Sequence, residues 1–346
     1  MKKSKKFVLA GLVLLAAITM VLLPLSSCKT DVDTSSPQQE QPGDTDNGNN
    51  DNDASVITTG DPAAFITEIT AAGTYTLVAT KECTDTAAIK DALRSLESRQ
   101  PDARIHLNLS QSGITSIGTD AFEGCSSLAR VEIPSSVTSI GNSAFFGCSS
   151  LASVTFAEGS RLEIIGQRAF QDCSSLARVE IPSSVTSIGE RAFQDCSSLD
   201  SVTFQAGSQL ASIGNSAFAF CSSLVSVEIP SSVTSIGKYA FSECSSLDSV
   251  EIPSSVTSIG EYAFRECSRL VSVKIPSSVT SIGGGAFFEC SELSTVKVEA
   301  EDPPILGVSV FDATDAGLKI QVPNTSVVYY ISNWSAYADK IEPITS

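Results

Sequence analysis

Cysteine thiols are the side chains whose spacing first suggests chemistry. Ten cysteines occur in 346 residues, and eight of them recur at intervals of 23 residues, with two intervals of 25. They are Cys125, Cys148, Cys173, Cys196, Cys221, Cys244, Cys267 and Cys290. This column could form a row of buried thiols, disulfides between neighbours or a metal site. We favour buried thiols, because parallel Cβ directions suit disulfides poorly and a straight row cannot surround a metal tetrahedrally. Cys83 stands outside the column, and its state stays open.

Other catalytic groups are scarce. The single histidine, His106, lies in a strand-like stretch away from other candidate ligands or nucleophiles, which argues against histidine catalysis and histidine-rich metal sites. The chain has 39 acidic against 22 basic residues, a net charge of -17, so a phosphate backbone is an unfavourable partner. We therefore expect no enzyme activity, no cofactor, no metal and no nucleic acid.

A 23-residue block gives the cysteines their spacing. It reads C-S-S-L-x-x-V-x-I-P-S-S-V-T-S-I-G-x-x-A-F-x-x. Its closing Ala-Phe pair recurs eight times, at Phe122, Phe145, Phe170, Phe193, Phe218, Phe241, Phe264 and Phe287. A fixed period of this length indicates that each block is one turn of a solenoid, whose core is built by repetition.

Each block predicts one strand and a row of inward side chains. The residues expected to point inward in one block are Leu128, Val131, Ile133, Val137, Ile140, Ala144 and Phe145. Pro134 should end the strand, because proline has no N–H for a sheet. Two blocks carry insertions, at residues 156–160 and 204–208, which should bulge one loop and leave the register intact.

The first residues resemble an export leader. Four lysines precede an uncharged run from Phe7 to Leu23, followed by Leu-Ser-Ser-Cys, which resembles a bacterial lipobox. That resemblance implies that residues 1–27 are a signal peptide and that Cys28 carries acyl chains, which would anchor the protein to a membrane. An uncleaved membrane-spanning anchor is the alternative. Residues 28–60 have little to bury and are expected to form a flexible acidic tether.

Two caps should cover the ends of the stack. Residues 61–112 are interpreted as an N-terminal cap, with strands near 74–78 and 105–109 and a helix over 87–96. The solenoid itself is predicted over 113–298. Residues 299–346 should form a C-terminal cap containing Tyr329, Tyr330, Trp334 and Tyr337. These aromatic residues could instead form a recognition patch, although covering the last coil is the favoured interpretation.

A binding face is expected on the outer side of the repeated strand. One outward column contains Arg130, Ser153, Arg178, Ser201, Ser226, Ser249, Ser272 and Thr295, and the other contains Glu132, Thr155, Glu180, Thr203, Glu228, Glu251, Lys274 and Lys297. Repeat proteins bind partners on such faces. The candidate ligand residues are the charged members, namely Arg130, Glu132, Arg178, Glu180, Glu228, Glu251, Lys274 and Lys297. The change of charge from Glu251 to Lys274 could align a partner of mixed charge, and ordinary solvated surface is the alternative.

The repeated block resembles the treponemal class of leucine-rich repeat found in BspA-like bacterial surface proteins. The resemblance covers residues 113–298, and Pro303-Pro304-Ile305-Leu306 and the later aromatic residues are similar to the family's usual ending. It implies a right-handed leucine-rich-repeat solenoid on the bacterial exterior, with adhesion to host matrix proteins or other bacteria. No catalytic residues follow from it. We expect an acylated surface protein, on the outer membrane, with a passive coat or spacer as the alternative function.

Overall fold

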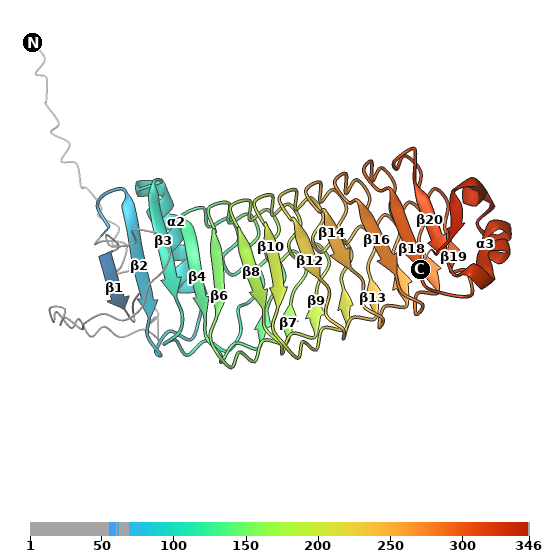
Figure 1. Ribbon diagram of the computed structural model, residues 1–346. Coiled ribbons are helices and arrows are strands. Elements are labelled where there is room, and N and C mark those ends of the chain that lie inside the picture. Colours follow the sequence, from blue (N-terminus) through green and yellow to red (C-terminus); the bar gives the residue numbers. More distant parts are fainter. Residues whose placement is uncertain (1–54, 60, 62–68, 345–346) are drawn as a thin grey trace, which may run out of the picture.

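The chain folds into an elongated stack of coils with a parallel sheet along each of two sides (Figure 1). The computed structural model describes residues 55–59, 61 and 69–344. The predicted signal peptide, Cys28 and most of the predicted tether lie outside these residues. In the described part, one sheet has 13 strands and the other has eight. We call them the long sheet and the short sheet.

The long sheet takes one strand from each coil and from both caps. Its strands, in order across the sheet, are β1 (Ser55–Thr59), β2 (Gly73–Ala79), β3 (Ala103–Asn108), β4 (Leu128–Ile133), β6 (Ser153–Phe156), β8 (Arg178–Ile181), β10 (Ser201–Phe204), β12 (Ser226–Glu228), β14 (Ser249–Glu251), β16 (Ser272–Ile275), β18 (Thr295–Val298), β20 (Lys319–Val322) and β21 (Ile341–Pro343). All of its pairings are parallel, and from β4 to β18 they join equivalent positions of neighbouring coils, as in Val202 with Val179. The stacking predicted from the period is therefore confirmed.

The short sheet is formed by a residue pair in the second half of each block, which is Ser-Ile in six of its eight strands. Its strands are β5 (Ser139–Ile140), β7 (Ile164–Ile165), β9 (Ser187–Ile188), β11 (Ser212–Ile213), β13 (Ser235–Ile236), β15 (Ser258–Ile259), β17 (Ser281–Ile282) and β19 (Ile305–Leu306). A Pro-Ser-Ser-Val turn connects the two sheets, closed in one coil by the Val137 N–H donating to the Pro134 carbonyl at 3.1 Å. Proline thus ends the strand, as predicted.

A column of stacked phenylalanine rings runs along the core. The predicted inward residues are all buried, and the eight phenylalanines stack with ring centroids 5.0 to 5.5 Å apart. A ninth ring, Phe311, continues the column at 5.6 Å from Phe287. Because β19 and β20 also extend both sheets, the stack continues beyond the predicted end at residue 298. The repeat pattern did not predict this coil, because Val310-Phe311 replaces Ala-Phe and no cysteine follows.

The N-terminal cap contains the predicted strands and helix. Helix α2 (Ala87–Arg99) buries Leu93 and Leu96, and its Lys90 Nζ donates to the Asp120 carbonyl of the first coil at 2.6 Å. The predicted tether is wrong at its end, since Ser55–Thr59 forms β1, which pairs in parallel with β2. The physical reason is the β-branched run that follows Ser55, which suits a strand, together with the edge of β2, which offers it ladder hydrogen bonds.

The C-terminal cap buries three of the four aromatic residues that were expected to cover the last coil. After η1 (Asn324–Ser326), helix α3 (Val327–Asn333) and η2 (Ser335–Lys340) place Tyr330, Trp334 and Tyr337 against the last coil. The Trp334 indole donates to the Pro304 carbonyl at 3.0 Å, and Trp334 packs on Phe311. Covering the last coil is thus confirmed for these three, whereas Tyr329 is half exposed. In the described part of the chain, no helix is both long and apolar enough to cross a membrane.

Candidate functional site

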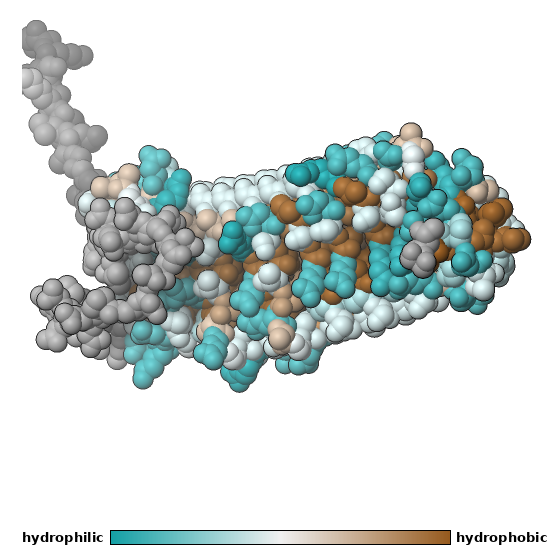
Figure 2. Space-filling model, in the orientation of Figure 1, coloured by the Kyte–Doolittle hydropathy of each residue, from teal (hydrophilic) through white to brown (hydrophobic). Residues whose placement is uncertain are grey.

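The outer face of the long sheet carries the columns expected from the sequence. Register pairs join Glu228 to Glu251, Glu251 to Lys274 and Lys274 to Lys297. Of the predicted charged residues, Glu132, Arg178, Glu180, Glu228, Glu251 and Lys274 are exposed, and Arg130 and Lys297 are partly buried. On the side seen in Figure 2, hydrophilic side chains are mixed with hydrophobic ones. The predicted positions are confirmed, and their role in binding stays a prediction.

The ion pairs on this face differ from what the register alone indicates. Lys274 is the register neighbour of Glu251, but its ammonium pairs with Glu299 at 3.0 Å. Arg178 pairs with Asp200 at 3.4 Å. Both pairs are solvent-exposed, so each contributes little to stability. Their effect is local neutralisation. The ammonium of Lys274 is paired with Glu299, and the carboxylate of Glu251 makes no ion pair or hydrogen bond with the other described residues.

A hollow of about 520 Å³ lies on this face beside the second insertion loop. Its lining comes from the end of β10, the loop after it and the two coils that follow. It consists of residues 202–208 and 228–231, with Glu251 and Pro253. The loop turns back at Gly207, which has a φ of +79° that favours glycine. The sequence located the insertion, but it did not predict that the insertion opens a hollow.

A second surface, which the sequence reasoning missed, is a row of acidic residues. We define the acidic row as the residues that precede each cysteine in six successive coils, and they are Asp172, Asp195, Phe220, Glu243, Glu266 and Glu289. Five are carboxylates, and Phe220 is 39% exposed in their middle. A shallow hollow of about 550 Å³ lies along this row from Asp195 to Glu289. The signal was present in the sequence, since the position before each cysteine can be read directly.

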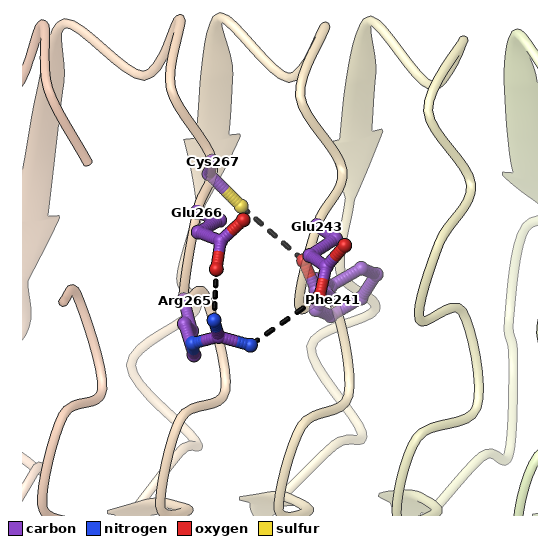
Figure 3. A network of polar contacts seen from close by, with 5 residues as sticks. All are labelled: Phe241, Glu243, Arg265, Glu266 and Cys267. Atoms are coloured by element: carbon purple, nitrogen blue, oxygen red, sulfur yellow. Dashed lines mark hydrogen bonds and ion pairs between the residues drawn. The ribbon is translucent and has the colours of Figure 1, made fainter. Parts of the chain in front are cut away.

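Partial burial and neighbouring carboxylates raise the pKa of two members of the acidic row. Partial burial, with the neighbouring Asp195 carboxylate, raises the pKa of Asp172. Partial burial and Glu266 raise the pKa of Glu243, while Arg265 opposes that rise. Arg265 bridges the Glu243 and Glu266 carboxylates (Figure 3). This arginine supplies the row with a local counter-charge, so the repulsion is greatest where no basic side chain intervenes.

The cysteines of the column lie directly behind the acidic row, inside the stack. All eight are buried and free, and from Cys148 onward each Sγ donates to a phenylalanine carbonyl in the preceding coil at 3.0 to 3.2 Å. Figure 3 shows this contact between Cys267 and Phe241. Burial raises the pKa of Cys125 and of Cys244 to about 12. The interpretation as buried thiols is confirmed. No cluster of three or more metal-ligating side chains occurs in the described ranges.

The family follows from the repeat itself. The family model described as the BspA type leucine-rich repeat region matches in six copies, over residues 105–209 and 204–315. The chain belongs to the BspA-type leucine-rich-repeat family. Members of this bacterial family are often associated with the cell surface, and solenoids of this type are typically non-enzymatic. No curated protein matches the BspA-type chain.

Several solved structures are similar to this BspA-type chain. A leucine-rich repeat protein from Bacteroides ovatus is 29% identical, with a TM-score of 0.48 over 60% of this chain and 59% of that one. A leucine rich cell surface protein from Faecalibacterium prausnitzii is 25% identical, with a TM-score of 0.39 over 82% of this chain and 85% of that one. The match therefore spans less than two thirds of the length of the Bacteroides protein.

Proposed function

We propose that this chain is a lipid-anchored protein of the bacterial cell surface, held on the outer membrane, that binds macromolecules through the outer face of its long sheet. The partners we propose are host extracellular-matrix proteins or proteins on other bacterial cells. The anchor would be the acylated Cys28, and the repeats would hold the binding face away from the membrane. The support for the anchor is the sequence Leu-Ser-Ser-Cys after an uncharged run.

The observation that carries the binding proposal is the long sheet's outer face. Its columns continue coil after coil in register, which gives an extended surface with exposed charges at regular spacing. Stable protein interfaces bury on the order of 800 Å² per partner, and several adjacent coils of such a sheet can supply that area. The face changes from acidic at Glu228 and Glu251 to basic at Lys274 and Lys297, so a partner with the opposite order of charges would bind in one alignment.

A solid-phase binding assay tests this function. The purified chain is applied to plates coated with reconstituted basement-membrane matrix, and the bound protein is measured with an antibody. Lys274→Glu with Lys297→Glu should reduce binding at least about tenfold if these cations contact the partner. The matched control is Lys81→Glu with Lys238→Glu, which makes the same change of charge away from the columns. An equal effect of both double variants, or no binding by the unchanged protein, would contradict the proposal.

Mass spectrometry of the mature N-terminus tests the anchor separately. We expect Cys28 to be the first residue and to carry acyl chains, and we expect Cys28→Ser to release the protein from the membrane fraction. Unmodified Cys28 in protein recovered from membranes would contradict the anchoring proposal and leave the binding proposal to its own assay.

The near-identity of the repeats favours a second candidate, a passive spacer or antigenic coat. Such a role needs length and exposure rather than a particular coil. Deleting residues 221–243, one complete block, distinguishes the two candidates. A spacer should keep its role after this deletion, whereas a binding face that uses Glu228 together with Glu251 and Lys274 should bind the matrix more weakly.

A further inference from the structure

The strands of the long sheet separate next to the second insertion loop. On the side of the preceding coil, β10 pairs over its whole length, from Ser201 to Phe204. On the side of the following coil, its pairing stops at Val202, so Thr203 and Phe204 have no ladder partner in β12. The loop is tied to the preceding coil as well, because the Gln205 N–H donates to the Ile181 carbonyl at 3.0 Å. The hollow of about 520 Å³ opens where β10 leaves β12.

Two carboxylates line this hollow without a counter-charge. Glu228 and Glu251 lie directly beside each other in register, which places their backbones about 4.8 Å apart. Like charges at such positions repel. Neither carboxylate makes a hydrogen bond or an ion pair with the other described residues, and Lys274, the cation nearest in register, is paired with Glu299.

The remaining lining is apolar or neutral. Phe204, Ile229, Pro230 and Pro253 contribute the apolar part, and Thr203 adds a hydroxyl. A ligand that fits this lining combines a delocalised positive charge with an apolar stem. Arginine meets both requirements, since its guanidinium spreads several donors in a plane and its stem packs on apolar surface.

We propose that this hollow is a binding site for an arginine side chain presented by an exposed segment of a partner protein, with Glu228 and Glu251 as the two acceptors. This inference rests on the proposed binding function and assigns it a ligand chemistry. The guanidinium donates to both carboxylates at once, which a single lysine ammonium does less well. The stem lies against Pro230 and Pro253. Two carboxylates are too few for a calcium site of six to eight oxygens, which makes a bound divalent cation the less suitable occupant.

A peptide-binding measurement with the full-length chain tests the site. Short peptides of glycine and serine with one central arginine are immobilised at high density, and binding is followed by surface plasmon resonance. Companion peptides carry citrulline, lysine or glutamate instead, and citrulline keeps the shape of arginine without its charge. We expect binding in the order arginine, lysine, citrulline, glutamate, with arginine at least about tenfold tighter than citrulline.

Matched variants locate the site on the protein. Glu228→Gln with Glu251→Gln should weaken binding of the arginine peptide about tenfold. Glu163→Gln with Glu292→Gln is the control, because these exposed glutamates lie outside the columns and outside the lining of the hollow. Equal binding of arginine and citrulline peptides, or an equal loss in the control variant, would overturn the proposal. So would binding that requires calcium and is abolished by EDTA, because that result assigns the site to a divalent cation.

The outcome separates this site from the wider function. If matrix binding persists and the arginine peptide is not bound, the arginine site is refuted and the proposed binding function stands. If the peptide is bound through Glu228 and Glu251 while the matrix is not, the site is supported and the proposed class of partner is wrong.

Discussion

Truncating one ring in the middle of the phenylalanine column should be far more costly than truncating an exposed one. Phe241 is fully buried and stacks on Phe218 at 5.5 Å and on Phe264 at 5.4 Å. Replacing a buried phenylalanine by alanine costs about 3–5 kcal/mol, since the apolar surface is lost and a cavity remains. Because two stacked neighbours lose their partner, we place Phe241→Ala at about 4–5 kcal/mol. That is a large part of a typical stability of about 5–15 kcal/mol.

Phe220 provides the matched control. It lies two residues from the buried Phe218, and it is 39% exposed in the acidic row. Phe220→Ala should change the free energy of unfolding by less than about 1 kcal/mol. The assay is equilibrium unfolding in urea, followed by far-UV circular dichroism. Long repeat arrays can unfold in more than one step, so the free energies of all resolved steps are summed.

The comparison of the two variants decides whether the reasoning holds. We expect Phe241→Ala to lower the free energy of unfolding by several kcal/mol more than Phe220→Ala does. A further expectation is that Phe122→Ala costs less than Phe241→Ala, because Phe122 stacks on a single ring among the described residues, that of Phe145. Similar losses for Phe241→Ala and Phe220→Ala would refute the view that the stacked rings hold the coils together.

Three other predictions address the glycines, the acidic row and the thiols. Gly260→Ala should destabilise the fold by about 1–3 kcal/mol, because the added Cβ would lie 2.6 Å from the Gly237 backbone. Gly118→Ala is the control and should be close to neutral in thermal unfolding, because a Cβ added there meets no atom within 4 Å. Asp172→Asn should raise the melting temperature at pH 7, because the raised pKa of Asp172 means that its charged form is unfavourable in the fold. The gain should shrink as the pH falls below the ordinary carboxyl pKa, where the carboxyl is protonated in both the folded and the unfolded chain. A gain that does not depend on pH would instead indicate that asparagine suits the left-handed backbone conformation of residue 172 better than aspartate. At pH 8 iodoacetamide should leave the eight column thiols unlabelled in the native protein and should label them in denaturant. The reason is burial, which blocks access of the reagent and raises the pKa of Cys244 to about 12. Rapid labelling of the native protein, measured by mass spectrometry, would contradict this prediction.

The repeat made the stack and its columns predictable. Because equivalent residues of successive blocks must lie beside one another, the period alone places Glu228 next to Glu251 and points Val131 inward. It also places the ring of Phe145 in a column. These features depend on backbone register, which a letter-for-letter repeat specifies without knowledge of side-chain conformation.

Features that depend on departures from the repeat were harder to predict. The partner of Lys274 is set by its side-chain rotamer, and its long flexible chain reaches Glu299 rather than Glu251. The hollow exists because the loop after Phe204 stays with the preceding coil and separates from the following one. The inserted residues alone do not indicate which of the two neighbouring coils the loop contacts. The additional coil at Phe311 lacks the motif letters, and the structure identifies it by its stacking on Phe287 and by β19 and β20, which extend both sheets.

Distances along one outward column test the central claim most directly, namely that the coils stack in register to form one continuous face. Nitroxide labels on cysteines substituted at Ser153 and Ser249 span four coil steps, and labels at Ser153 and Thr295 span six. At about 4.8 Å for each step, pulsed electron spin resonance should report backbone separations of about 19 Å and about 29 Å. Separations that do not increase by about 10 Å between the two pairs would contradict the stacked solenoid and the binding face derived from it.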